Sequence, residues 1–121
     1  MKKIVLVDDE PNIIMSLEYT FKKNNFEVFI ARDGQEALDI LKTEQPDIII
    51  LDIMMPYVDG YATLEAIKKN EKLKKCKVIF LSAKNKEVDI EKGMQMGADA
   101  YVTKPFSVKK LVEQVNELLN K

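Results

Sequence analysis

Polar side chains that could bind a metal ion and a phosphoryl group follow four apolar segments of the chain. These are Asp8 and Asp9 after residues 4–7, Asp52 after 48–51, Ser82 after 78–81, and Lys104 after 100–103. A buried carboxylate is costly unless a cation or hydrogen bonds compensate it. Three carboxylates, a hydroxyl and an ammonium brought to one place would form a site for a cation and a phosphoryl group.

The elements that would position these side chains alternate along the sequence. Short apolar runs predict strands at 3–7, 27–31, 47–52, 77–82 and 100–103, and amphipathic patterns predict helices at 11–24, 35–43, 60–70, 87–96 and 107–120. The runs at 47–52 and 77–82 are almost continuously apolar, which is typical of parallel strands covered on both faces. Five strand–helix units in succession therefore predict an α/β fold with a parallel sheet between two layers of helices.

Local signals support these helix boundaries. Asp33 with Glu36 three residues later resembles a capping box. Asp59 and Ser107 are suited to be the N-caps of the helices that follow them.

The predicted sheet would bring the acidic residues together. Ligands of open parallel sheets bind beyond the carboxyl ends of the strands, where the strand order reverses. If strand 3–7 neighbours strand 47–52, then Asp8, Asp9 and Asp52 meet there. Two like charges about 4 Å apart repel by about 4 kcal/mol at an effective dielectric of about 20, so the cluster needs a cation or a shared proton.

Magnesium is the cation that suits this cluster best. Mg²⁺ takes oxygen ligands, commonly one or two carboxylates together with a substrate phosphate. With the metal and Lys104 nearby, Asp52 could remain ionised and attack phosphorus as a nucleophile. Positive charge around the transferring group is the main requirement of phosphoryl transfer, so the sequence predicts an aspartyl phosphate.

Composition excludes several other functions. The chain has 121 residues, enough for one domain, with 46% hydrophobic and 32% charged residues. Its net charge of -1 argues against nucleic-acid binding by this domain, and the absence of histidine excludes histidine-based catalysis. The basic stretch 68–77 is interpreted as a solvated helix end and loop. A single cysteine, no apolar run long enough to span a membrane and no signal peptide predict a cytoplasmic protein.

Four motifs give the chain an end-to-end resemblance to the response-regulator receiver domains of two-component signalling, including chemotaxis regulators. They are Val7-Asp8-Asp9-Glu10, Leu51-Asp52-Ile53-Met54-Met55-Pro56 with Asp59-Gly60, Leu81-Ser82-Ala83, and Lys104-Pro105-Phe106. The resemblance implies a single flavodoxin-like (βα)5 receiver domain over residues 1–121, with strand order 2-1-3-4-5.

The resemblance also implies roles for the acidic residues. Asp52 would be the phosphoacceptor, taking the phosphoryl group from a histidine kinase or phosphotransfer protein. Asp9, Asp52 and the backbone carbonyl of Met54 would bind Mg²⁺ directly, with Mn²⁺ as a possible substitute. Asp8 would act through a water molecule.

Further roles are implied for residues around the phosphoryl group. Lys104, Ser82 and the backbone N–H of Ala83 would bind its oxygens, and Ser82 and Tyr101 would form the conformational switch. The positions of Met54 and Lys84 would tune the access of water and thus dephosphorylation. Pro105 is the candidate for a cis peptide bond, although X-Pro bonds in general favour trans.

The predicted function is a phosphorylation-activated signalling switch rather than an enzyme. It would assist its own phosphorylation and dephosphorylation, and it would change the face formed by helix 87–96, strand 100–103 and helix 107–120 to control an output partner. The alternatives are the receiver of a DNA-binding regulator that dimerises on phosphorylation, and a degenerate, non-phosphorylated interaction module. The sequence leaves the cognate kinase, the phosphoryl lifetime and the choice between monomer and dimer open.

Two other classes fit less well. A metal-dependent phosphatase of the haloacid-dehalogenase kind expects a second acid two residues after its nucleophile, where this chain has Met54. A flavodoxin-like nucleotide binder would need phosphate-loop glycines, but the segment Asp8-Asp9-Glu10-Pro11 would repel a phosphate in the absence of a metal.

Overall fold

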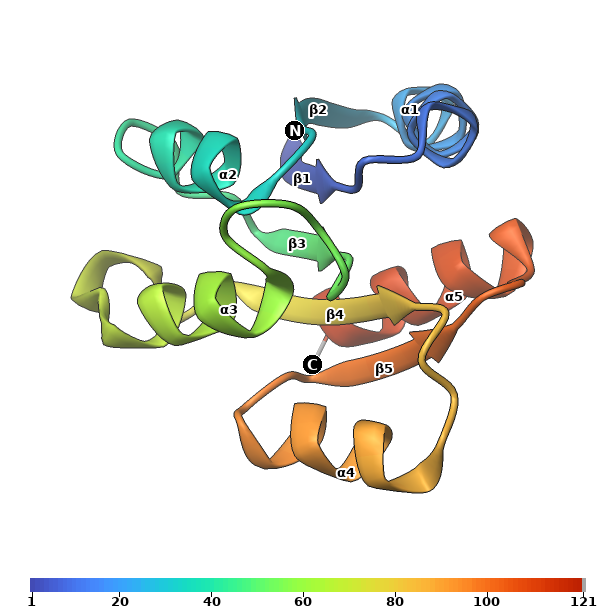
Figure 1. The fold of residues 1–121 in the computed structure, drawn as a ribbon. Helices are drawn as coiled ribbons and strands as arrows, with labels where there is room; N and C mark the ends of the chain where they lie inside the picture. The colour runs from blue at the N-terminus through green and yellow to red at the C-terminus, as the bar shows by residue number, and fades with distance from the viewer. Residues whose placement is uncertain (121) are drawn as a thin grey trace.

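Five apolar runs, rich in β-branched and aromatic residues, form one parallel sheet in the computed structural model, which describes residues 1–120 (Figure 1). The strands are β1 (Lys2–Val7), β2 (Phe26–Ala31), β3 (Ile48–Leu51), β4 (Lys77–Ser82) and β5 (Ala100–Thr103). Their order is β2-β1-β3-β4-β5. The predicted strands and strand order are confirmed, and each strand boundary lies within one residue of its expected place.

Five α-helices connect these strands. They are α1 (Pro11–Lys23), α2 (Gly34–Ile40), α3 (Gly60–Lys69), α4 (Glu87–Gln95) and α5 (Val108–Leu119). A short 3-10 helix, η1 (Glu71–Leu73), follows α3 and was not predicted. It begins where the side chain of Asn70 accepts a hydrogen bond from the backbone N–H of Lys72 at 3.0 Å. Among residues 1–120, no helix is both long enough and apolar enough to cross a membrane.

The predicted N-caps are confirmed. Asp33, Asp59 and Ser107 each accept a hydrogen bond from the backbone N–H three residues later, at 2.9–3.2 Å. The capping box at Asp33 is only half formed, because Glu36 accepts from the backbone N–H of Arg32 instead of that of Asp33.

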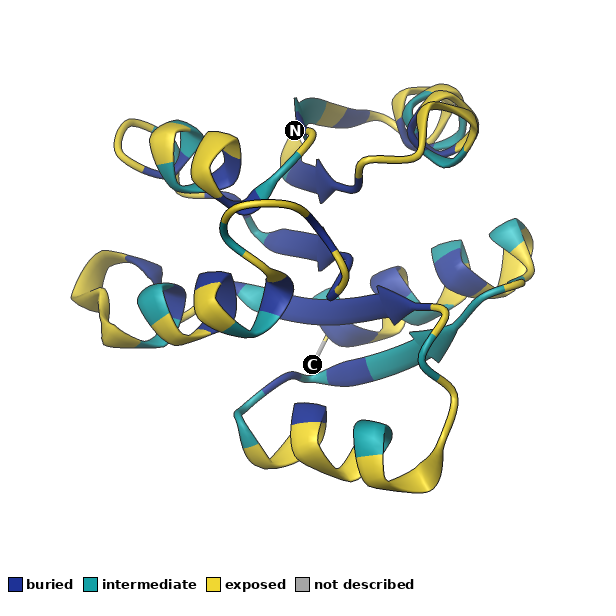
Figure 2. Cartoon of the chain, in the orientation of Figure 1, coloured by how far each residue is buried: buried dark blue, intermediate teal, exposed yellow. Residues whose placement is uncertain are grey.

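Two hydrophobic cores lie on opposite faces of the sheet. Helices α1 and α5 cover one face, and α2, α3 and α4 cover the other (Figure 1). Successive side chains of a strand point to opposite faces, so Ile4 and Leu6 pack toward α1 and α5 while Val5 and Val7 pack toward α2, α3 and α4. The central strands are buried along almost their whole length, and the outer surfaces of the helices are exposed (Figure 2). Because a shift of one residue would move every side chain of a strand to the opposite face, burial of both faces fixes the register of the strands.

Candidate functional site

The strand order reverses between β1 and β3, and the acidic residues lie at this point. Val7 and Leu51 are register partners at the ends of the two strands, so Asp8 and Asp52 follow side by side. The backbone N–H of Asp52 donates to the carbonyl of Val7 at 2.9 Å, which extends the pairing by one residue. The sheet itself therefore holds the two aspartates next to each other, as the sequence predicted.

Three carboxylates converge here. One oxygen from each of Asp8, Asp9 and Asp52 lies within 4.8 Å of the others. Asp8 and Asp52 are each only 3% exposed, whereas Asp9 is exposed. Two buried acids and one exposed acid thus form a small site that opens to solvent on the side of Asp9.

Lys104 provides the positive charge of this site. Its Nζ lies 3.0 Å from Oδ2 of Asp8, 3.1 Å from Oε1 of Glu10 and 3.6 Å from Oδ2 of Asp52. The backbone N–H of Lys104 donates to the carbonyl of Ser82 at 2.8 Å, and the peptide bond between Lys104 and Pro105 is cis. Glu10 was not predicted as a site residue; its place directly after Asp8 and Asp9 was the signal available in the sequence.

Burial and mutual repulsion shift the ionisation of these groups. Burial, reinforced by the charge of Asp8, raises the pKa of Asp52 to about 6. Burial also raises the pKa of Asp8. For the Lys104 ammonium burial acts to lower the pKa, but its contacts with Asp8, Glu10 and Asp52 outweigh burial and raise the pKa above its ordinary value. Lys104 therefore stays charged, and one ammonium only partly offsets two buried carboxylates.

The donor set fits a hard divalent cation. Oδ1 of Asp8 accepts a hydrogen bond from the backbone N–H of Glu10 at 2.9 Å. Oδ2 of Asp8 is fully buried and forms an ion pair with Nζ of Lys104 at 3.0 Å. Three carboxylates gathered around a single ammonium leave negative charge that an oxygen-preferring divalent ion would compensate.

Ser82 and Tyr101 are joined through one residue of the loop after β4. The side chain of Ser82 is fully buried, and its Oγ accepts a hydrogen bond from the backbone N–H of Lys84 at 3.1 Å. The hydroxyl of Tyr101 donates to the backbone carbonyl of Lys84 at 2.7 Å. The loop residue Ala83, between Ser82 and Lys84, is exposed. Two hydrogen bonds to the backbone of Lys84 therefore connect Ser82 with Tyr101.

An open cavity of about 410 Å³ adjoins the acidic cluster. Asp9, Met54 and Lys84 are among the residues that line it. The backbone N–H of Met54 donates to Oδ1 of Asp52 at 3.3 Å, and the Met54 side chain is 59% exposed. The two positions that the resemblance assigns to water access thus line one cavity together with Asp9.

Gly60 is a second residue whose importance the sequence did not indicate beyond its place in a motif. A Cβ at Gly60 would collide with the carbonyl oxygen of Asp52 and with Cα of Ile53. The backbone N–H of Gly60 donates to the carbonyl of Ile53 at 2.9 Å. The start of α3 can lie this close to the backbone of Asp52 only because residue 60 has no side chain.

Comparison with known proteins agrees with this geometry. The model of the response regulator receiver domain family matches residues 4–116. The receiver domain of the Francisella response regulator 1452 is similar, with 35% identity and a TM-score of 0.91 over 99% of this chain and 98% of that chain. The chemotaxis response regulator CheY4 of Vibrio cholerae has 27% identity and a TM-score of 0.91 over 98% of both chains.

A third similar structure contains a metal. The receiver domain of the sensor histidine kinase PA1611 from Pseudomonas aeruginosa PAO1 has 26% identity and a TM-score of 0.90, over 99% of this chain and 98% of that chain. That structure has a magnesium ion coordinated in its active site cleft.

The fold, the acidic site and the family match lead to one conclusion: this chain belongs to the response regulator receiver domain family. Receiver domains are signalling domains of two-component systems that take phosphoryl groups from histidine kinases on an aspartate and act on output domains.

Proposed function

We propose that this chain is a receiver domain over residues 1–121 and that Asp52 is its phosphoacceptor, modified in a Mg²⁺-dependent reaction. The observation that carries the proposal is the buried carboxylate of Asp52, 3.6 Å from the Lys104 ammonium and clustered with Asp8 and Asp9. The resemblance expects every one of these residues, and none is replaced, which argues against a degenerate receiver.

In the proposed reaction a carboxylate oxygen of Asp52 attacks the phosphorus of a phosphohistidine on the donor protein. The P–N bond breaks, its electron pair stays on the imidazole nitrogen, and an acyl phosphate forms on Asp52. With a pKa of about 6, Asp52 is mostly ionised at neutral pH and therefore able to attack. Lys104, Ser82 and the backbone N–H of Ala83 bind the phosphoryl oxygens.

Asp9, Asp52 and the backbone carbonyl of Met54 would hold Mg²⁺, or Mn²⁺ in its place, with Asp8 acting through a water molecule. The bound ion would supply positive charge to the phosphoryl oxygens during transfer. Asp8 and Lys104 keep this pocket polar and orient Asp52, since both contact or adjoin its carboxylate.

The proposed output is a change of the face formed by α4, β5 and α5. A phosphoryl group on Asp52 adds negative charge and acceptor oxygens beside Ser82 and Lys104. Ser82 moves toward it and releases the backbone N–H of Lys84, and Tyr101, bonded to the carbonyl of Lys84, changes its position in turn. This altered face then controls an output protein or effector domain in the cytoplasm.

The test is intact mass spectrometry after incubation with Mg²⁺ and acetyl phosphate. We expect one added phosphoryl group that requires Mg²⁺ and is absent from Asp52→Asn. Asp59→Asn is the matched control, because Asp59 is an exposed N-cap close to the same loop. An adduct that persists in Asp52→Asn, or no adduct with either acetyl phosphate or a panel of phosphorylated histidine kinases, would contradict the proposal.

A further inference from the structure

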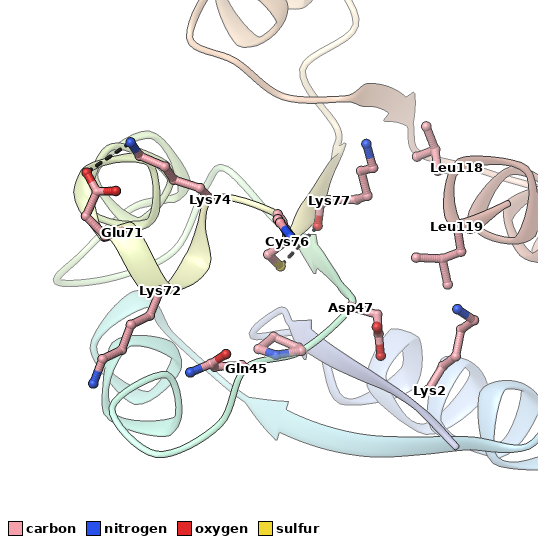
Figure 3. Close-up of a pocket in the computed structure, with 12 residues that line it drawn as sticks. Lys2, Gln45, Asp47, Glu71, Lys72, Lys74, Cys76, Lys77, Leu118 and Leu119 are labelled. Carbon is pink, nitrogen blue, oxygen red and sulfur yellow. Dashed lines mark hydrogen bonds and ion pairs between the residues drawn. The ribbon is translucent and has the colours of Figure 1, made fainter. Parts of the chain in front are cut away.

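A second hollow lies at the amino end of the sheet, at the opposite end of the strands from Asp52. It has a volume of about 610 Å³ and is formed by the starts of β1 and β4, the segment before β3, the loop around η1 and the end of α5 (Figure 3). We call it the amino-end groove. Five lysines line it, namely Lys2, Lys72, Lys74, Lys75 and Lys77, together with the two acids Asp47 and Glu71.

Each of the two acids already interacts with another residue of the chain. Glu71 forms an ion pair with Lys74 at 2.9 Å. Oδ2 of Asp47 accepts a hydrogen bond from the backbone N–H of Lys3 at 2.8 Å. The other four lysines form no ion pair with any residue in the described part of the chain, 1–120; they are Lys2, Lys72, Lys75 and Lys77.

The groove therefore concentrates positive charge on a protein whose net charge is -1. Lys72, Lys75 and Lys77 come from the stretch that the sequence analysis interpreted as a solvated helix end and loop. The fold adds Lys2 from the distant start of β1 and makes the surface concave. Like charges gathered in a hollow raise the local potential and attract an anion.

The arrangement of the lysines indicates which anion. Lys72 lies at one side of the groove and Lys2 and Lys77 at the other, with Gln45 and Asp47 between them (Figure 3). Charges spread along a hollow match a row of carboxylates better than they match one compact phosphate.

The apolar part of the lining supports the same choice. Leu118 and Leu119 add an apolar wall at the end of α5, which would accommodate an aliphatic side chain between the carboxylates.

We propose that the amino-end groove binds an extended acidic peptide segment of a partner protein, rich in glutamate or aspartate with an intervening aliphatic residue. The groove and the Asp52 site lie at opposite ends of the strands, so both can be occupied at once. The proposal does not depend on phosphorylation of Asp52.

The test is fluorescence anisotropy with a labelled decapeptide of glutamates around a central leucine, in EDTA and at low ionic strength of about 50 mM. We expect saturable binding that is weakened about tenfold or more by the double substitution Lys72→Glu with Lys75→Glu. Both side chains are exposed and form no ion pair with residues 1–120, so the fold should be retained. The matched control is Lys109→Glu with Lys110→Glu, two exposed lysines of α5 outside the groove, which should change affinity less than about twofold.

Thermal unfolding checks that both double variants are folded, and Lys75→Gln provides a milder change should the first variant unfold. A glutamine version of the peptide should not bind. The proposal is overturned by any of three results: no saturable binding up to about 1 mM peptide, an equal loss of affinity in the control variant, or displacement of the peptide by inorganic triphosphate at a lower concentration than by unlabelled peptide. The last result would assign the groove to small polyphosphates.

Discussion

The buried carboxylate of Asp52 is held in a place where its charge is only partly compensated. Burial and Asp8 raise the pKa of Asp52 to about 6, and Lys104 offsets part of that shift. Burial and the charge of Asp8 make the ionised form of Asp52 costly, yet with a pKa of about 6 the carboxylate is still mostly ionised at neutral pH and available for reaction. Acidic residues with a shifted pKa are common in functional sites.

Replacing Asp52 by asparagine should stabilise the metal-free protein at pH 7.5. The pKa of Asp52 is raised in the folded state, so the folded protein binds a proton more tightly than the unfolded chain. Wild-type stability is then lost as the pH rises from about 4 through about 6. We expect Asp52→Asn to raise the free energy of unfolding by roughly 1–3 kcal/mol at pH 7.5 and by little near pH 4, measured by urea unfolding in EDTA.

The control for this measurement is Asp39→Asn. Asp39 is exposed, and hydrogen bonding by Gln35 followed by contact with Lys42 lowers its pKa. Asp39→Asn should therefore give no stabilisation at pH 7.5. A lower stability of Asp52→Asn than of wild type at that pH would show that the charge of Asp52 is well compensated.

The side chain of Lys84 lines the open cavity beside the acidic cluster, which Asp9 lines as well. Lys84→Ala should open this path to water and shorten the lifetime of the phosphorylated form by roughly two- to tenfold, with little change in stability. The decay of phosphorylated protein followed by Phos-tag electrophoresis measures the lifetime. Lys86→Ala, at the start of α4 and outside the cavity, is the control, and equal lifetimes of Lys84→Ala and wild type would disprove the role.

At the scale of elements, the loop from β3 to α3 positions the site. The loop leaves β3 at Asp52 and returns so closely that Gly60, the first residue of α3, lies against the backbone of Asp52 and Ile53. The Asp59 side chain caps α3 at the same place. The position of the Asp52 backbone is thus fixed by the sheet on one side and by the start of a helix on the other.

Gly60→Ala should destabilise the fold by about 1–3 kcal/mol, since the added Cβ meets backbone atoms that cannot move without shifting Asp52. A helix normally gains stability from a change of glycine to alanine, so the expected sign is the reverse of the intrinsic propensity. Thermal and urea unfolding measure the loss, and the rate of phosphorylation by acetyl phosphate should fall with it. Unchanged or higher stability would mean that the approach of α3 to Asp52 is looser than the structure has it.

At the scale of the whole molecule, the two ends of the sheet carry opposite charge. Asp8, Asp9 and Asp52 gather at the carboxyl ends of the strands, and the lysines of the amino-end groove gather at the other ends. Parallel strands make this separation possible, because all five present the same end to the same side. A cation and an acidic segment would therefore be attracted to opposite ends of one molecule.

Magnesium should stabilise the whole fold. An ion that binds only the folded state at ten times its dissociation constant adds about 1.4 kcal/mol to the free energy of unfolding. We expect the midpoint of thermal unfolding to rise with Mg²⁺ concentration in wild type and to rise much less in Asp8→Asn and Asp52→Asn. Asp59→Asn, which lies outside the acidic cluster, serves as the control. An equal rise in all four proteins would show that Mg²⁺ acts nonspecifically.

Some of the fold and the site could be read from the sequence, because local patterns encode them. Alternating apolar runs and helical stripes gave the strands and helices, and polar residues directly after the runs gave Asp8, Asp9, Asp52, Ser82 and Lys104. Parallel strands bring such residues to one edge whatever the details of packing. The order of the strands came from the family resemblance rather than from these patterns.

Other features depend on contacts between residues far apart in the sequence, and only the tertiary structure decided them. The ion pair of Lys104 with Glu10, the hydrogen bond of Tyr101 to Lys84 and the close approach of Gly60 to Asp52 have no local signature. The amino-end groove depends on the fold in the same way, since Lys2 and Lys77 line one hollow only when β1 and β4 lie in one sheet. The sequence by itself determined which polar groups follow the strands, and these groups define the chemistry of the proposed site. The tertiary structure decided which charges face one another, because distances between distant segments are set by packing and not by local pattern.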